Sequence, residues 1–222
     1  MSLRSALKGS LSAGLIAALR LVRSEIHLYR LHRAGVKRAS AYSVLTGLKL
    51  NIGCGANRKP GWVNIDLAPN VDLSLDLRER IPLADGSARL IYSEHFFEHL
   101  DYPGDALRFL GECRRLLAPG GIFSVGVPDT EWPLAAYAGP DAQGYFALMR
   151  EKQWHPAWCH TRLDHINYHF RQDGEHRYAY DFESLEHALA QTGFKLIRRR
   201  EFDPDLDSKE REQGTLYVEA TR

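Results

Sequence analysis

The chain has 222 residues, of which 44% are hydrophobic and 26% are charged, and its formal net charge is +1. This is the composition of an ordinary folded domain, so global disorder and fibrous repeats are excluded. The near-neutral charge makes nucleic acid an unexpected partner, and no apolar run approaches the roughly 20 residues that cross a bilayer. Three widely spaced cysteines, without a Cys-x-x-Cys pair, argue against a disulfide framework and favour a reducing, cytoplasmic compartment.

Positive charge is concentrated at the start of the chain. Residues 1–48 carry eight basic side chains and one acidic side chain, Glu25, so this extension has a net charge of +7 and the rest of the chain −6. An amphipathic helix is predicted over residues 12–33, ending at Gly35. Its apolar positions follow helical spacing: Leu11, Leu15, Leu19, Val22, Ile26 and Tyr29.

The basic helix has two open interpretations. It can pack on the body as a lid or as the arm of a homodimer. It can also lie on a membrane, with its arginines toward anionic lipid of the inner membrane surface. A signal peptide is not expected, because Arg20 and Arg23 follow the short apolar stretch at once and no cleavage site is recognisable.

Residues 49–222 alternate predicted strands with predicted helices, which is the pattern of an α/β fold. Helices are expected over residues 102–117, before Pro119-Gly120-Gly121, and over residues 181–192, with Asp181 as N-cap. This order predicts a seven-stranded, mostly parallel sheet with helices on both faces, after an N-terminal helical extension. Strands are predicted at residues 48–52, 62–65, 71–75, 89–93, 122–127, 194–197 and 215–218.

A glycine-rich loop follows the first predicted strand, where Gly53-Cys54-Gly55 succeeds Asn51-Ile52. In open parallel sheets, ligands bind beyond the carboxyl ends of the strands, and glycine lets the backbone approach them closely. Asp66 ends the second strand, where a carboxylate can accept hydrogen bonds from both hydroxyls of a ribose. A tight turn without a ligand is the alternative, but the glycines together with Asp66 favour a nucleoside.

The spacing of this loop does not suit a dinucleotide or a nucleotide phosphate. Arg58 stands where a dinucleotide fold has its third glycine. Only residues 54–61 separate the two strands, and Pro60-Gly61 uses two of them for a turn, so a full phosphate-binding helix does not fit. The loop therefore predicts a nucleoside ligand without phosphates.

With these motifs the chain resembles the class I S-adenosylmethionine-dependent methyltransferases, and most closely the small type-11-like family. The resemblance implies a Rossmann-like fold. The family's usual Asp before the fourth strand is Arg89 here. The resemblance covers residues 49–129 through Leu50–Gly55, Gly61–Asp66, Asp76-Leu77, Ile81-Pro82-Leu83, Glu98-His99-Leu100 and Leu116–Gly121, and continues more weakly through Asp181–Phe194.

The resemblance implies S-adenosylmethionine as cofactor and S-adenosylhomocysteine as product. The glycine loop would line the methionine moiety, Asp66 would hold the ribose, and Asp76 with the backbone of Leu77 would meet the adenine amine. Glu94 and His95 would flank the sulfonium. The full set of expected cofactor-binding residues is Asn51, Gly53, Cys54, Gly55, Asp66, Leu67, Asp76, Leu77, Glu94 and His95.

Methyl transfer is an in-line displacement, so alignment and exclusion of water supply much of the catalysis. A general base is needed only for a hydroxyl or an unactivated amine. His165 is our first candidate for this base, followed by His95 and Asp129. Packing roles for the two histidines and an N-cap role for Asp129 are the alternatives.

Residues 129–180 show neither the helical nor the strand periodicity of apolar residues. They are interpreted as a cap inserted into the methyltransferase domain. The cap is rich in histidine, but the spacing matches no known ligand pattern, so no metal site is expected. A polar pocket for a small or glycan acceptor is favoured instead, with the histidines of the cap and Arg162 as donors near aromatic walls from Trp154, Trp158, Tyr168 and Tyr178. The histidines are His155, His160, His165, His169 and His176, with Cys159 and Asp164 in the same stretch.

The predicted function is methyl transfer from S-adenosylmethionine to a small polar or glycan acceptor. Two alternatives stay open: a non-catalytic protein of the same fold that binds the adenosyl cofactor, and an RNA- or membrane-associated methyltransferase that uses the basic extension. RNA is the minor case, because the body is acidic and no recognition module is visible.

Overall fold

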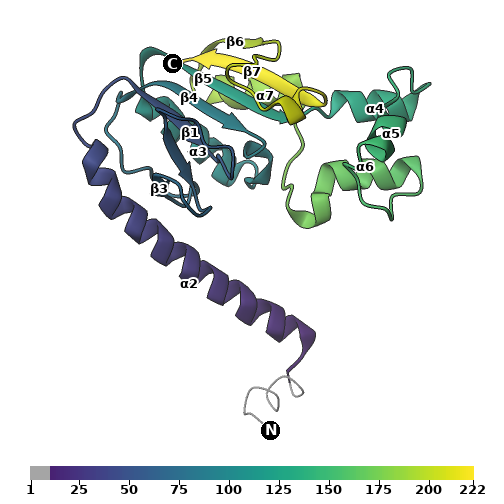
Figure 1. The fold of residues 1–222 in the computed structure, drawn as a ribbon, viewed down its shortest axis with the longest axis horizontal. Coiled ribbons are helices and arrows are strands. Elements are labelled where there is room, and N and C mark those ends of the chain that lie inside the picture. The colour runs from purple at the N-terminus through teal and green to yellow at the C-terminus, as the bar shows by residue number, and fades with distance from the viewer. Residues whose placement is uncertain (1–10) are drawn as a thin grey trace.

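The computed structural model describes residues 11–222, so Arg4 and Lys8 of the basic extension lie outside the described residues. A seven-stranded sheet with the order β3-β2-β1-β4-β5-β7-β6 forms the centre of the fold (Figure 1). Strands β1 to β5 run parallel, and β7 is antiparallel to β5 and β6, which confirms the predicted sheet. The strands are β1 (Leu48–Ile52), β2 (Val63–Asp66), β3 (Leu73–Ser74), β4 (Ala88–Glu94), β5 (Leu117–Pro128), β6 (Lys195–Arg199) and β7 (Thr215–Thr221).

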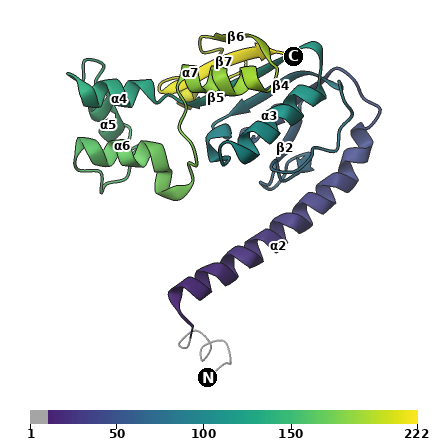
Figure 2. The same cartoon turned by 180° about the vertical axis from the view of Figure 1, so that it is seen from behind.

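Two helices cover one face of the sheet, α3 (Gly104–Leu116) and α7 (Phe182–Gln191), and Figure 2 shows both on the same side. Phe123 of β5 contacts Phe109 of α3 and Phe194 after α7, with ring centroids 6.4 and 5.6 Å apart. Asp181 caps α7 as predicted, because its carboxylate accepts a hydrogen bond from the backbone N–H of Ser184 at 2.8 Å. Buried residues of both helices belong to the main hydrophobic core.

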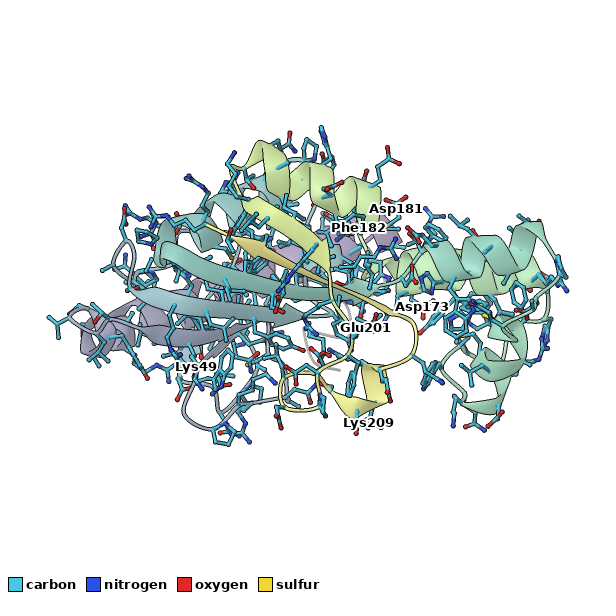
Figure 3. All side chains as sticks on the ribbon, turned by 90° about the horizontal axis from the view of Figure 1, so that it is seen from above. Lys49, Asp173, Asp181, Phe182, Glu201 and Lys209 are labelled. Atoms are coloured by element: carbon cyan, nitrogen blue, oxygen red, sulfur yellow. The ribbon has the colours of Figure 1, made fainter. Side chains whose placement is uncertain are left out.

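The two faces of the sheet are covered differently. On the side of β4 opposite α3 and α7, a polar segment without a packed helix covers the sheet. Figure 3 shows the segment with Lys209 across the sheet from Phe182, at the start of α7. Arg200 forms an ion pair with buried Asp207 at 2.5 Å, and Asp207 accepts a hydrogen bond from the hydroxyl of Tyr92 at 3.0 Å. Residues 200–212, called the cover segment below, thus hold this face through buried charge pairs and hydrogen bonds.

The N-terminal helix α2 (Ala13–Ala39) is longer than predicted and does not end at Gly35. A Cβ on Gly35 would lie 2.1 Å from the backbone oxygen of Ser74, so glycine there permits close contact with β3 rather than a helix stop. The contact continues through Arg38, whose guanidinium donates to the hydroxyl of Ser74 at 2.8 Å. Figure 1 shows the N-terminal part of α2 projecting away from the body.

Two glycines of α2 give a matched test of this contact. We expect Gly35→Ala to lower the free energy of unfolding by about 1–3 kcal/mol, because overpacking against β3 must displace backbone. We expect Gly14→Ala to be neutral or to stabilise by up to about 1 kcal/mol, since its Cβ meets no described atom within 4 Å. Urea unfolding of both variants measures the difference, and equal stability would contradict close packing at Gly35.

Three helices form a separate small layer beyond the end of β5 (Figure 1): α4 (Glu131–Ala138), α5 (Tyr145–Glu151) and α6 (Arg162–Arg171). They share a hydrophobic cluster of their own, made by Ala136, Tyr145, Phe146 and Met149. The region predicted as a cap is thus largely helical. Within residues 11–222, no helix is both long and apolar enough to traverse a bilayer.

Candidate active site

The glycine loop after β1 is shaped by two left-handed residues, Gly53 (φ +68°) and Gly55 (φ +50°). A Cβ on Gly53 would lie 2.2 Å from the Phe96 ring, whereas a Cβ on Gly55 would meet no described atom within 4 Å. The backbone N–H of Gly55 donates to the Asp66 carboxylate at 2.8 Å. The loop therefore packs against Phe96 on one side and leaves open space beside Asp66 on the other.

Two acidic residues lie beyond β2 and β3. Asp66 also accepts a hydrogen bond from the backbone N–H of Ala68 at 2.8 Å, across the half-buried Leu67. Asp76 is buried, and burial raises its pKa, but hydrogen bonds from Arg78 outweigh burial and lower the pKa below its usual value. The Asp76 carboxyl is therefore ionised at neutral pH.

Asp76 joins the sheet to α2. Its backbone N–H donates to the imidazole of His32 at 3.2 Å, and its carboxylate contacts Arg78 at 2.7 Å. Arg78 also forms an ion pair with Glu25 of α2 at 2.9 Å. Leu77 is buried in the core beside this contact. The C-terminal part of α2 thus lies against the expected adenine end of the site.

Asn51 and Cys54 stabilise the glycine loop from within. The side-chain amide of Asn51 donates to the backbone oxygen of Asn57 at 2.8 Å and to the side-chain oxygen of Asn64 at 3.0 Å. Burial, aided by nearby Asp66, raises the pKa of the Cys54 thiol to about 11, so the thiol stays protonated. Asn51 links the loop to β2, and Cys54 fills space as a neutral side chain.

Glu94 and His95 lie at the carboxyl end of β4, where the cover segment reaches them. The Glu94 carboxylate accepts hydrogen bonds from the hydroxyl and backbone N–H of Ser208, at 2.5 and 3.1 Å. His95 has φ +52°, and its Nε2 lies 2.8 Å from the Thr215 hydroxyl. Burial, with Arg211 nearby, lowers the pKa of His95 well below its usual value, so the ring is neutral. The sequence analysis missed Ser208, Arg211 and Thr215, because no motif marks this polar loop.

A cavity of about 340 Å³ opens between the cap, the ends of β4 and β5, and the end of the cover segment. Two of the expected aromatic walls, Trp154 and Tyr168, line it, whereas Trp158 packs edge-on against Tyr168 and Tyr178 stacks on Tyr102. The full lining is His95, Pro128, Trp132, Tyr145, Met149, Trp154, His155, Tyr168, His169, Gln172, His176, Glu210, Arg211, Gln213 and Gly214.

His165 lies behind His155 relative to this cavity. Its side chain is 2% exposed, and its Nδ1 lies 2.9 Å from Nδ1 of His155, which lines the cavity. Burial and the neighbouring His165 lower the pKa of His155 to about 4, and burial lowers the pKa of His165 as well. The two rings form a neutral hydrogen-bonded pair at neutral pH, with His155 at the cavity surface.

Asp129 lies outside the lining of that cavity. Its carboxylate accepts a hydrogen bond from the backbone N–H of Glu131 at 2.9 Å, at the start of α4. Burial raises its pKa. The N-cap of α4 is Thr130, so Asp129 stands one residue before the cap and contacts the first turn of the helix from there.

Glu98, on the 3-10 turn η2 (Phe97–His99), belongs to a motif of the family resemblance but was not predicted as a site residue. Its side chain is 2% exposed, and neither oxygen has a hydrogen-bond partner among residues 11–222. Burial raises its pKa to about 8. Imidazole nitrogens of His95, His99 and His176 lie 3.9, 3.9 and 4.0 Å from Oε1 of Glu98.

Comparison with known proteins decides the family. A family model described as a methyltransferase domain matches residues 26–199. The chain belongs to the S-adenosylmethionine-dependent methyltransferases. A stretch of 61 residues is 36% identical to a probable S-adenosylmethionine-dependent methyltransferase of Mycolicibacterium smegmatis, and it covers 28% of this chain but only 23% of that relative.

Solved structures are similar to the methyltransferase at low sequence identity. A possible exported protein from Bordetella parapertussis superposes with a TM-score of 0.50 and 13% identity, over 86% of this chain and 66% of that chain. A SAM dependent methyltransferase from Archaeoglobus fulgidus gives a TM-score of 0.49 and 14% identity, over 89% of this chain and 94% of that one.

The residues beyond β1, β2 and β3 fit S-adenosylmethionine. The open space beside Gly55 lies next to the half-buried Asp66 carboxylate, and the buried Asp76 adds a second acceptor. Carboxylates suit the hydroxyls and amines of this cofactor, and their negative charge suits its cationic sulfonium. These hydrogen-bond acceptors fit the cofactor of the family.

Proposed function

We propose that the methyltransferase transfers a methyl group from S-adenosylmethionine to a small polar or glycan acceptor bound in the 340 Å³ cavity. One observation carries the proposal: the cavity opens at His95, at the end of β4, and β4 is the direct neighbour of β1 with its glycine loop. Aromatic walls with polar groups between them suit the apolar faces and hydroxyls of a sugar.

The bound cofactor supplies an electrophilic methyl group on a cationic sulfur. In the proposed arrangement, Asp66 accepts hydrogen bonds from the ribose hydroxyls, and Asp76 with the backbone of Leu77 contacts the adenine amine. Gly53, Cys54 and Gly55 line the methionine moiety, with Asn51 and Leu67 completing the site. Glu94 contributes negative charge near the sulfonium. These residues bind the cofactor and orient its methyl group, as an in-line displacement requires.

A hydroxyl acceptor must lose its proton as the S–CH₃ bond breaks and the O–CH₃ bond forms. The neutral His155–His165 pair can take this proton at the cavity surface, and the neutral His95 ring is the second candidate. Asp129 stays a third, less direct candidate, because its carboxylate contacts the first turn of α4. His165 then acts through His155, as a positioning residue.

We expect His165→Ala to lower kcat by about 100-fold or more, because it removes the partner that orients the proton acceptor. Cofactor affinity should not change, since the pair lies in the cap. The same measurements on His160→Ala, an exposed histidine of the cap, provide the control. Full activity of the His165 variant would remove it from the reaction.

The function is tested by isothermal titration of the purified chain with S-adenosylmethionine, S-adenosylhomocysteine and NAD, followed by an acceptor screen that begins with sugars. We expect micromolar binding of the two adenosyl ligands, no binding of NAD, and a methylated product detected by mass spectrometry. Trp154→Ala should raise KM for the acceptor and leave cofactor affinity unchanged. Cofactor binding without turnover of any acceptor class, RNA included, would favour a non-catalytic binding protein.

A peripheral contact with the inner membrane surface through residues 12–33 is part of the proposal. Leu15, Leu19 and Val22 of α2 are about half exposed, at 46%, 52% and 55%, with Arg20 and Arg23 on the same stretch. Such a stretch favours an anionic lipid surface.

Co-sedimentation with vesicles tests the membrane contact. We expect binding to vesicles that contain anionic phospholipid and none to neutral vesicles, with binding lost in Arg20→Glu/Arg23→Glu. If the protein forms a concentration-dependent dimer and does not bind vesicles, α2 is instead the arm of a homodimer.

A further inference from the structure

The turn η2 and the segment after α6 are joined so that one carboxylate and two imidazoles converge. The backbone N–H of Arg177 donates to the backbone oxygen of Glu98 at 2.8 Å, which brings residue 176 next to η2. The ligand atoms of Glu98, His99 and His176 lie within 4.8 Å of one another. These three residues are called the Glu98 triad.

The imidazoles of the triad are held with their free nitrogens toward Glu98. Nδ1 of His99 lies 3.0 Å from the backbone oxygen of Glu175, and Nδ1 of His176 lies 2.9 Å from that of His169. A carbonyl oxygen only accepts, so each Nδ1 carries the hydrogen and each Nε2 presents a lone pair. Such backbone hydrogen bonds commonly orient histidines that ligate metals.

We propose that Glu98, His99 and His176 bind a divalent transition-metal ion, with Nδ1 of His95 as a further ligand. No metal site was expected from the sequence, because the spacing of the histidines in the cap matches no known ligand pattern. Glu98 and His99 lie outside the cap and far along the chain from His176. The gaps of 3.9–4.0 Å between the imidazole nitrogens and Oε1 are too long for hydrogen bonds. An ion with bonds of about 2.0–2.2 Å bridges such gaps. It also provides the partner that the buried carboxylate lacks.

The second cluster of candidate ligands, His155, Cys159 and His165, does not need an ion. Its two imidazoles already form a hydrogen bond with each other at 2.9 Å. Burial raises the pKa of the Cys159 thiol, which disfavours the thiolate that binds metals. In the second cluster Nε2 of His165 is the buried atom without a hydrogen-bond partner, whereas in the Glu98 triad both carboxylate oxygens of Glu98 lack one among residues 11–222.

The metal site adjoins the acceptor cavity, because His95 and His176 both line that cavity. Three or four protein ligands of this kind leave a coordination position for a further oxygen. That position faces the cavity and suits a hydroxyl or carboxylate oxygen of the acceptor. This second step rests on the proposed function, whereas metal binding itself does not.

The experiment uses the full chain without a polyhistidine tag, stripped with a chelator and titrated with Zn²⁺ by calorimetry and with Co²⁺ by visible absorption. We expect one tightly bound ion per chain in the wild type. Glu98→Gln and His176→Gln should each weaken Zn²⁺ binding at least about 100-fold. His187→Gln, on the exposed face of α7, and Cys159→Ser, in the second cluster, should bind as the wild type does.

Each result of these titrations either supports or overturns the proposed metal site. No stoichiometric Zn²⁺ binding, or equal binding by Glu98→Gln and His176→Gln, would overturn the site. Loss of binding in Cys159→Ser, or a sulfur-to-cobalt charge-transfer band, would overturn it in favour of the second cluster. Circular dichroism and S-adenosylhomocysteine titration of the same variants separate this outcome from misfolding and from a failed cofactor proposal, because both signals should be unchanged.

Discussion

Gly53→Ala is expected to abolish measurable cofactor binding and to lower the free energy of unfolding by about 3 kcal/mol. The substitution adds left-handed strain of about 1–2 kcal/mol and a clash worth about 1–3 kcal/mol. Its Cβ would lie 2.2 Å from Cγ and 2.4 Å from Cβ of Phe96, and because Cβ is fixed to the backbone, the clash requires a shift of the chain after β4. Calorimetric titration with S-adenosylhomocysteine and urea unfolding measure the two effects.

Gly55→Ala is the matched control. Its φ of +50° is also left-handed, but a Cβ there meets no described atom within 4 Å, so only about 1–2 kcal/mol of strain is expected. Any further loss of cofactor affinity in Gly55→Ala then reports a ligand that occupies the open space. If the two variants lose equal stability, the close approach of Phe96 does not govern the loop.

Asp66→Ala should weaken binding of S-adenosylhomocysteine by about 10- to 150-fold. Hydrogen bonds to a charged group contribute about 1.5–3 kcal/mol, and about 1.4 kcal/mol corresponds to a factor of ten. Part of the loss comes through the loop itself, because the carboxylate also holds the backbone N–H of Gly55 at 2.8 Å. Isothermal titration gives the affinity directly.

Asp66→Asn separates the two contributions of Asp66, since its amide oxygen can still accept from Gly55 while one acceptor for the ligand is lost. Asp205→Ala, an exposed carboxyl of the cover segment, controls for the change of net charge. Unchanged affinity in Asp66→Ala, with the fold intact by circular dichroism, would rule out the proposed ribose contact.

Local sequence signals predicted those parts of the fold that local physics controls. Alternating strands and helices, Asp181 as N-cap and the short turn after Gly55 each depend on neighbouring residues, and the structure confirms the sheet and the cap of α7. Gly35 was predicted wrongly as a helix end. Gly35 allows the helix to lie close to the backbone of Ser74, and no pattern among neighbouring residues reveals this tertiary contact.

The contacts that were missed join residues far apart along the chain. Ser208 reaches Glu94, and His176 reaches Glu98, with more than 70 residues between the partners in each case. Tertiary pairing of this kind leaves no periodicity and no motif in one sequence. The family resemblance included Glu98 and His99 as part of a sequence motif. It gave no sign that His176 lies beside them in the fold.

The walls of the acceptor cavity come from chain that lies outside the parallel strands. On one side the wall is formed by Arg211 of the cover segment and by Gln213 and Gly214, which follow it. The cap forms the other side, and the ends of β4 and β5 contribute only His95 and Pro128. Loops and insertions tolerate substitution far better than buried strands do. Libraries diversified in the cap and in residues 210–214 can therefore alter acceptor selectivity while the strands that carry the cofactor site keep their sequence.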